Sequence, residues 1–234
     1  MIVCRVLGPV EVTVDGATAP PELLWRKHLA LLVYLARSPR RVRTREHLSG
    51  LLWPDKDESA ARHSLNEALR VVRKAAGDDA IDTTAGQVRL AVQAVQLDTD
   101  DLEARATQAR WAEAAAMVAG EFLEGFALPG SDTFEDWLAA ERRHWTARST
   151  RFLLGHGEAL LREGRTEEAL AVARRAAAID PESELVVRAV MGACAVLGDS
   201  TAALDHFTRF TDRRNRESGS GPGAETRIDR KSVV

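Results

Sequence analysis

A run of polar side chains between residues 58 and 76 has the types and spacing that could bind nucleic acid. At 100° per residue, Leu65, Leu69 and Val72 share one face of a predicted helix, and the polar side chains occupy the remaining surface. The candidate DNA-binding residues on this helix are Arg62, His63, Asn66, Glu67, Arg70, Arg73 and Lys74. Arginine can bind guanine through two hydrogen bonds, and asparagine can bind adenine in the same way.

Position along the helix predicts different roles for these residues. His63, Asn66 and Arg70 combine hydrogen-bond donors with an outward position, so we expect them to contact base edges. Arg73 and Lys74 lie near the C-terminal end of the helix, where we expect phosphate contacts, which position a protein without reading sequence.

Glu67 and Arg62 fit this pattern less directly. Glu67 could accept a hydrogen bond from cytosine, or it could pair with Arg70 three residues later and orient it. Arg62 lies nearer the apolar edge of the helix. The alternative interpretation of these polar residues is an ordinary solvated helix face. The pattern of the surrounding elements favours a DNA-binding face over a solvated one.

The elements around this helix are typical of a winged helix. In chain order they are short strands over residues 3–14, a helix over 25–36, a second helix over 45–52, the third helix over 58–76 and a hairpin over 81–90. Thr44 can cap the second helix, and either Asp55 or Asp57 can cap the third, which Gly77 closes. This order predicts an α+β winged helix-turn-helix domain over residues 1–97, with the hairpin as the wing.

Basic side chains also lie outside the third helix. Arg89 lies on the wing, where a contact with DNA phosphate and a solvated hairpin are both compatible with the sequence. Arg37, Arg40, Arg41 and Arg43 flank the end of the first helix, and one or two of them could contact phosphate. A charged cluster of this kind is more often a solvated surface.

The distribution of charge supports a division into two domains. The whole chain has a net charge of −3, but residues 1–97 have 14 basic and 11 acidic residues, whereas residues 98–234 have 18 and 24. Between Arg37 and Lys74 the excess is 10 basic over 5 acidic residues. A basic N-terminal part joined to an acidic remainder is typical of a DNA-binding domain followed by a protein-interaction domain.

After residue 97 the pattern becomes helical and repeats. Predicted helices cover residues 102–119, 134–163, 166–179, 183–197 and 200–215. At an offset of 34 residues, Gly164 corresponds to Gly198 and Ala169 to Ala203, which is the period of a tetratricopeptide repeat. We therefore predict an all-α tetratricopeptide-like domain over residues 98–217, with both alanines buried.

Several other function classes find no support in the sequence. The six histidines show no metal-binding spacing, and no nucleotide-binding or nucleophile motif occurs, so we expect no enzyme activity, catalytic residue, metal or cofactor. The longest uncharged run has about ten residues, against about 20 for a membrane helix, so we expect no membrane partner. Two cysteines without a CxxC pair and a start that is not typical of a secretory signal predict a cytoplasmic protein.

The Gly-, Ser- and charge-rich residues 218–234 predict a flexible tail.

Motifs in both predicted domains resemble those of the antibiotic-regulatory-protein family of bacterial activators. Residues 51–55 with 61–77 resemble its OmpR-type winged helix. The segments similar to its bacterial transcriptional activation domain are residues 120–126, residues 134–138, and Gly219 with Pro222, Glu225 and Thr226. The resemblance covers about residues 2–227, and the combination of motifs is more specific than any one of them.

This resemblance implies a transcriptional activator that binds double-stranded DNA at promoter direct repeats, as a homodimer, and contacts RNA polymerase. Two alternatives stay open at this point. The chain could be a helical-repeat scaffold for protein–protein interaction, or it could be the N-terminal regulatory part of a longer signalling protein. Glu67 departs from the family by placing an acid on the expected reading face.

Overall fold

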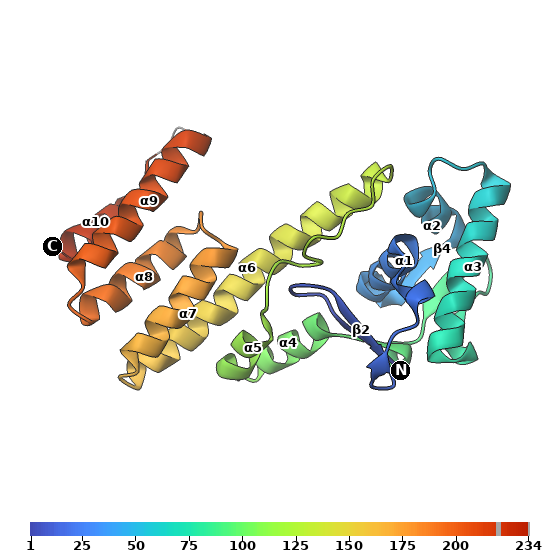
Figure 1. The fold of residues 1–234 in the computed structure, drawn as a ribbon, viewed down its shortest axis with the longest axis horizontal. Helices are drawn as coiled ribbons and strands as arrows, with labels where there is room; N and C mark the ends of the chain where they lie inside the picture. The colour runs from blue at the N-terminus through green and yellow to red at the C-terminus, as the bar shows by residue number, and fades with distance from the viewer. Residues whose placement is uncertain (219–220, 234) are drawn as a thin grey trace. The chain divides into compact units, whose positions relative to one another are not determined.

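The computed structural model describes residues 1–218 and 221–233, which divide into two compact units. One unit contains Met1–Asp101 and Ala119–Arg143, and the other contains Leu102–Val118 and His144–Val234. The division does not follow the chain in a simple order, because the segment that begins at Ala119 adds to the N-terminal unit. Figure 1 shows the order of the elements along the chain.

The N-terminal unit begins with a four-stranded sheet. Its strands are β1 (Ile2–Arg5), β2 (Glu11–Val14), β3 (Ala17–Thr18) and β7 (Val95–Leu97), in the spatial order β3-β2-β1-β7. The first three strands are antiparallel neighbours, and β7 pairs with β1 in parallel. The parallel strand brings residue 98 next to the start of the chain, where the Asp98 carboxylate accepts the backbone N–H groups of Val6 (3.0 Å) and Leu7 (3.1 Å).

The segment that begins at Ala119 forms backbone hydrogen bonds with the residues that follow β1. Leu7 accepts a hydrogen bond from the backbone N–H of Ala119 at 3.1 Å, and Gly8 donates to the carbonyl of Glu121 at 2.9 Å. Gly8 has φ of 123°, and a Cβ added there would lie 2.9 Å from the Cβ of Ala119. Only glycine therefore fits where these two backbones meet.

Three helices follow the sheet, as the sequence predicts. They are α1 (Arg26–Arg37), α2 (Arg45–Leu52) and α3 (Glu58–Ala76). Thr44 Oγ1 accepts the backbone N–H of His47 at 3.2 Å, which caps α2. Asp57 caps α3, because its Oδ1 accepts the N–H of Ala60 at 2.9 Å, so Asp57 and not Asp55 has this role. Leu31, Leu48 and Leu65, one from each helix, are fully buried in the shared core.

The predicted wing is a small three-stranded sheet. Its strands are β4 (Val42–Thr44), β5 (Ile81–Asp82) and β6 (Gln87–Leu90), in the order β4-β6-β5. At the tip of the hairpin, Ala85 has φ of 54° and Gly86 has φ of 73°. Two successive positive φ values are typical of the tight turn that joins antiparallel strands.

The rest of the described chain is helical. Its helices are α4 (Asp98–Thr107), α5 (Trp111–Met117), α6 (Asp132–Arg162), α7 (Thr166–Ile179), α8 (Glu184–Val196), α9 (Ser200–Ser218) and α10 (Ala224–Val233). The single helix that the sequence predicted over residues 102–119 is in fact two, α4 and α5. The chain turns between them at Ala109, whose φ is 56°, and Arg110 donates its backbone N–H to Arg105 at 3.0 Å. Periodicity alone did not indicate this break, since no glycine or proline marks it.

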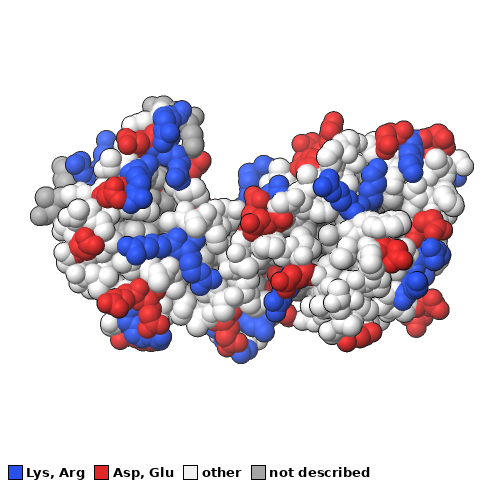
Figure 2. Space-filling model, in the orientation of Figure 1, with Lys and Arg blue, Asp and Glu red and all other residues white. Residues whose placement is uncertain are grey.

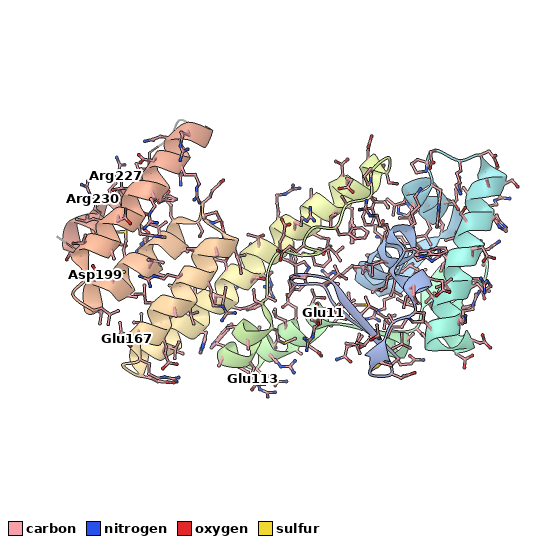
Figure 3. All side chains as sticks on the ribbon, viewed as in Figure 1. Glu11, Glu113, Glu167, Asp199, Arg227 and Arg230 are labelled. Atoms are coloured by element: carbon pink, nitrogen blue, oxygen red, sulfur yellow. The ribbon has the colours of Figure 1, made fainter. Side chains whose placement is uncertain are left out.

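The 34-residue repeat is confirmed in the helical unit. Gly164 and Gly198 both have φ of 75° and end equivalent helices, and α7, α8 and α9 pack in succession (Figure 1). Ala169 is 2% exposed and Ala203 is fully buried, as the repeat requires. Asp199, labelled in Figure 3, caps α9 by accepting the N–H of Ala202 at 2.9 Å.

The predicted flexible tail contains a helix, α10, which packs against α8 and α9. The Glu184 carboxylate accepts hydrogen bonds from Thr226 Oγ1 (2.6 Å) and the Gly223 N–H (3.0 and 3.1 Å). Arg230, labelled in Figure 3, lies over the Phe207 ring at 5.3 Å. Composition missed this helix because tertiary contacts stabilise it. Of the motif predicted here, Thr226 is buried, and Gly219 lies outside the described residues.

Candidate nucleic-acid interface

Helix α3 presents a polar face to solvent along its whole length. Its buried face consists of Ala61, Leu65, Ala68, Leu69, Val71 and Val72. The exposed candidates are Arg62, His63, Asn66, Arg70 and Lys74, whereas Glu67 and Arg73 are partly buried. Figure 2 shows basic and acidic side chains interleaved over α3, at the right of the view. The predicted face exists, and Arg62 and Arg70 on it have acidic partners.

Three elements converge beside Asn66. The Arg45 guanidinium, at the start of α2, donates a hydrogen bond to the side-chain oxygen of Asn66 on α3. The backbone N–H of Arg45 donates to the carbonyl of Gly86, at the tip of the wing, at 2.9 Å. A hollow of about 790 Å³ opens between these elements and is also lined by Lys56 and Arg62. The start of α2, the first half of α3 and the wing tip therefore form one continuous polar surface.

Arg73 connects α3 to the wing within the protein. Its guanidinium donates to the carbonyl of Ile81 at 3.2 and 3.3 Å and to Thr83 Oγ1 at 3.3 Å. These bonds position the hairpin relative to α3. The sequence predicted a phosphate contact for Arg73, and that role stays a prediction beside this structural one.

Glu67 and Arg70 form an ion pair on the exposed face. Arg70 donates from Nε and Nη2 to Glu67 Oε2, at 3.1 and 2.9 Å. These hydrogen bonds and the charge of Arg70 hold the pKa of the Glu67 carboxyl below its usual value, so Glu67 is ionised at neutral pH. Of the two roles predicted for Glu67, the pairing with Arg70 is the one present in the unbound chain. Arg62 is paired in a similar way, with Glu58 one turn earlier.

Lys74 and Arg89 are candidates that form neither an ion pair nor a hydrogen bond with another described residue. Lys74 lies in the last turn of α3 and Arg89 lies on β6, and both are exposed. His63 lines a shallow hollow together with Trp25 and Lys27, at the start of α1. Lys74 and Arg89 have the free positive charge that a phosphate contact requires.

Sequence reasoning missed two cations beside this surface. Arg45 directly follows the cap residue Thr44, so the sequence could have predicted that it lies in the first turn of α2. Lys56 lies in the turn between α2 and α3, where its Nζ donates to Ser64 Oγ at 2.8 Å.

The arginines at the end of α1 proved to be partly structural. Arg37 donates to Glu141 at 3.0 Å, and Arg41 donates to the carbonyl of Val95 at 2.7 Å and to Asp100 at 2.9 Å. Arg41 therefore serves the fold and is a poor candidate for phosphate binding.

Within residues 1–218 and 221–233, no cluster of three or more His, Cys, Asp or Glu side chains has a geometry for a metal ion. None of the helices in the same part of the chain combines the length and apolar character that crossing a bilayer requires.

Comparison with known proteins bears on this surface and on the helices that follow it. A family model described as bacterial transcriptional activator domain matches residues 87–233, which is more than half of the chain. The chain belongs to the bacterial transcriptional activator domain family. This membership confirms the resemblance to antibiotic-regulatory-protein regulators that the sequence motifs indicated, and with it the assignment to transcription regulation.

One solved structure has a similar fold over nearly the whole chain. It is Mycobacterium tuberculosis EmbR in complex with a low-affinity phosphopeptide, with a TM-score of 0.76 and 19% sequence identity. The alignment covers 99% of this chain and 64% of the EmbR chain. The chain described here therefore spans less than two thirds of the length of the EmbR chain. The likeness confirms the predicted fold class, a winged helix-turn-helix followed by tetratricopeptide-like helices. No curated protein sequence matches the chain.

Proposed function

We propose that this protein is a sequence-specific, DNA-binding transcriptional activator whose recognition helix is α3. The convergence of Arg45, Asn66 and Gly86 carries the proposal. In a winged helix-turn-helix the recognition helix enters the major groove, and the neighbouring helix and the wing contact the flanking backbone. The joining of α2, α3 and the wing by these three residues supports that geometry.

The polar and charged side chains of α3 and the wing support two kinds of DNA contact, with base edges and with phosphates. His63, Asn66 and Arg70 supply donors for base edges, and Arg62 lies beside them. Lys74 and Arg89 supply free positive charge for phosphates on either side. Arg73 positions the wing and lies beside Lys74, next to the proposed path of the DNA backbone. The domains are proposed as residues 1–97 for DNA binding and 98–217 for activation.

The partners follow from the family to which the chain belongs. We infer that the protein binds promoter direct repeats as a homodimer and that its helical domain contacts RNA polymerase. Such a regulator acts in the cytoplasm, where bacterial DNA lies, and it needs neither a catalytic residue nor a cofactor.

An electrophoretic mobility-shift titration of the full chain, at two salt concentrations, tests DNA binding directly. Each phosphate that the protein neutralises contributes about −0.9 to the slope of log K against log [salt]. We expect a clearly negative slope on any duplex and tighter binding to one selected sequence. A slope near zero, or binding with no sequence preference, would contradict the proposal.

The rival function is a helical-repeat scaffold in which the winged helix binds protein. The acid Glu67 on the exposed face and the net charge of −3 are the observations that favour it. The mobility-shift titration separates the two, since a scaffold would not shift duplex DNA.

A further inference from the structure

A half-open groove lies within the helical unit, between α6, α7 and α8. Its volume is about 790 Å³, within the range of roughly 300–1,000 Å³ that is typical of small-molecule sites. Half of its lining residues are leucine and alanine, including Leu154, Leu161 and Leu185. Leu185 is 63% exposed, although α8 has a buried face elsewhere. The groove therefore has an apolar surface that the described residues leave uncovered.

Thr150 lines this groove with a hydroxyl group that has no hydrogen-bond partner among the described residues. Its side chain is buried, with 5% of the residue exposed. Other helical threonines of the same chain do not have this problem. Thr107, Thr208 and Thr211 each donate to the carbonyl four residues earlier, at 2.9 Å. A buried hydroxyl without a partner is unfavourable, so a ligand that bonds it gains free energy.

Arg151, the next residue of α6, also lines the groove and is exposed. The arginines near it already have acidic partners: Arg148 with Glu103, Arg162 with Glu158 and Arg188 with Asp229. No described residue forms an ion pair or a hydrogen bond with Arg151. The groove therefore combines an apolar wall, an unsatisfied hydroxyl, one free guanidinium and two acids, Glu158 and Asp180. Glu158 already pairs with Arg162, outside the groove lining.

We propose that this groove binds a small organic anion with an apolar body. The anionic group pairs with Arg151, an oxygen of the ligand bonds the Thr150 hydroxyl, and the apolar body packs against Leu154 and Leu185. Charge-assisted hydrogen bonds of this kind fix orientation, and the apolar contact supplies most of the affinity. The site goes beyond the DNA-binding proposal and does not depend on it.

The first experiment uses the full chain and the fluorescent probe 8-anilinonaphthalene-1-sulfonate, which combines an aromatic body with an anion. We expect its fluorescence to rise on binding and dodecanoate to displace it. Arg151→Gln should weaken probe binding about tenfold, which corresponds to one charge-assisted pair. Leu185→Glu should also weaken it, by placing an acid on the exposed wall. Arg174→Gln is the matched control, because Arg174 is exposed on α7 and does not line the groove.

The second experiment separates binding from folding. Thr150→Val removes the unpaired hydroxyl, so it should raise the Tm of the free protein by about 2–4 °C and also weaken probe binding. Ser149→Ala is the control, because Ser149 is an equally buried hydroxyl without a partner on the same helix that does not line the groove. It should raise the Tm and leave probe binding unchanged.

Three results would overturn the proposal. The first is equal probe affinity of the wild type and Arg151→Gln. The second is displacement by dodecanol as effective as that by dodecanoate, which would remove the requirement for an anion. The third is that neither 8-anilinonaphthalene-1-sulfonate nor dodecanoate binds whereas an apolar peptide does. That result would assign the groove to a protein partner.

Discussion

Arg70 donates two hydrogen bonds to a single oxygen of Glu67, at 3.1 and 2.9 Å, on the exposed face of α3. The pair lies three residues apart on the helix and holds the guanidinium in one orientation. Because both bonds end on Oε2, the second carboxylate oxygen has no part in them. The exposed face of α3 therefore contains a cation whose orientation is set by an adjacent acid.

Replacing Arg70 tests base reading. Arg70→Ala should remove a bidentate contact with a base, which costs about 1–3 kcal/mol on the preferred site and relaxes the choice of base at one position. Competition mobility shifts with single-base variants of the selected sequence measure both effects. If the variant is folded and discriminates among duplexes as the wild type does, α3 does not read bases through Arg70.

Replacing Glu67 tests the role of the acid. Glu67→Gln keeps an oxygen that can accept from Arg70 and removes a negative charge close to the proposed phosphates. We expect tighter binding to every duplex, specific or random, with the same sequence preference. A broadened preference at one base pair would instead assign Glu67 to cytosine.

Lys74 and Arg89 should hold the DNA backbone. Lys74→Ala and Arg89→Ala should each weaken binding to specific and random DNA alike and reduce the salt slope by about one. Arg41→Ala is a useful comparison, because Arg41 bonds Val95 and Asp100 within the fold. Its loss should lower stability and leave the salt slope unchanged. An unaltered slope in Lys74→Ala and Arg89→Ala would remove them from the interface.

His47 should make the N-terminal unit sensitive to mild acid. Burial and the positive charge of Arg43 lower the pKa of His47 below 6.5, and its Nε2 lies 2.6 Å from Tyr34 Oη. The unfolded chain therefore binds this proton more readily than the folded protein, so His47 favours folding fully above about pH 6.5 and less as pH falls. A histidine NMR titration should give a midpoint below 6.5, and a midpoint at or above 6.5 would contradict this environment.

Ala203 should not tolerate a larger side chain. It is fully buried in a cluster with Leu170, Val190 and Phe207, where helices of the repeat approach closely. Ala203→Leu should lower the free energy of unfolding by about 1–3 kcal/mol through overpacking. Urea denaturation measures this change. Ala195→Leu is the matched control on an exposed position of α8 and should be nearly neutral.

Two glycines of α6 should respond in opposite directions to alanine. A Cβ at Gly155 would lie 3.2 Å from the Trp111 ring, whereas a Cβ at Gly157 would meet only the carbonyl of Ala169 at 3.9 Å. Gly155→Ala should therefore destabilise the protein. Gly157→Ala should stabilise it by about 0.5–1 kcal/mol, because alanine favours the helix. Thermal unfolding of the two variants tests the difference, and equal Tm values would contradict it.

The sequence alone determined the elements whose signals are local. Thr44 caps α2 and Gly77 ends α3, because these residues bond or adopt positive φ within a few positions of their own. The sequence left Asp55 and Asp57 as alternatives for the cap of α3, and the structure assigns that role to Asp57. The 34-residue spacing of Ala169 and Ala203 likewise predicted burial, since close helix packing requires a small side chain at each position.

Only the tertiary structure decided which of the cations face solvent. Arg37 bonds Glu141 across 104 residues of chain, and Arg45 reaches Asn66 across 21. No periodicity encodes such pairs, because they form only when separate elements are packed together. The same reason explains α10, whose polar sequence is typical of a loose tail. Its contacts come from another helix, where Glu184 accepts the N–H of Gly223, just before α10, and the hydroxyl of Thr226.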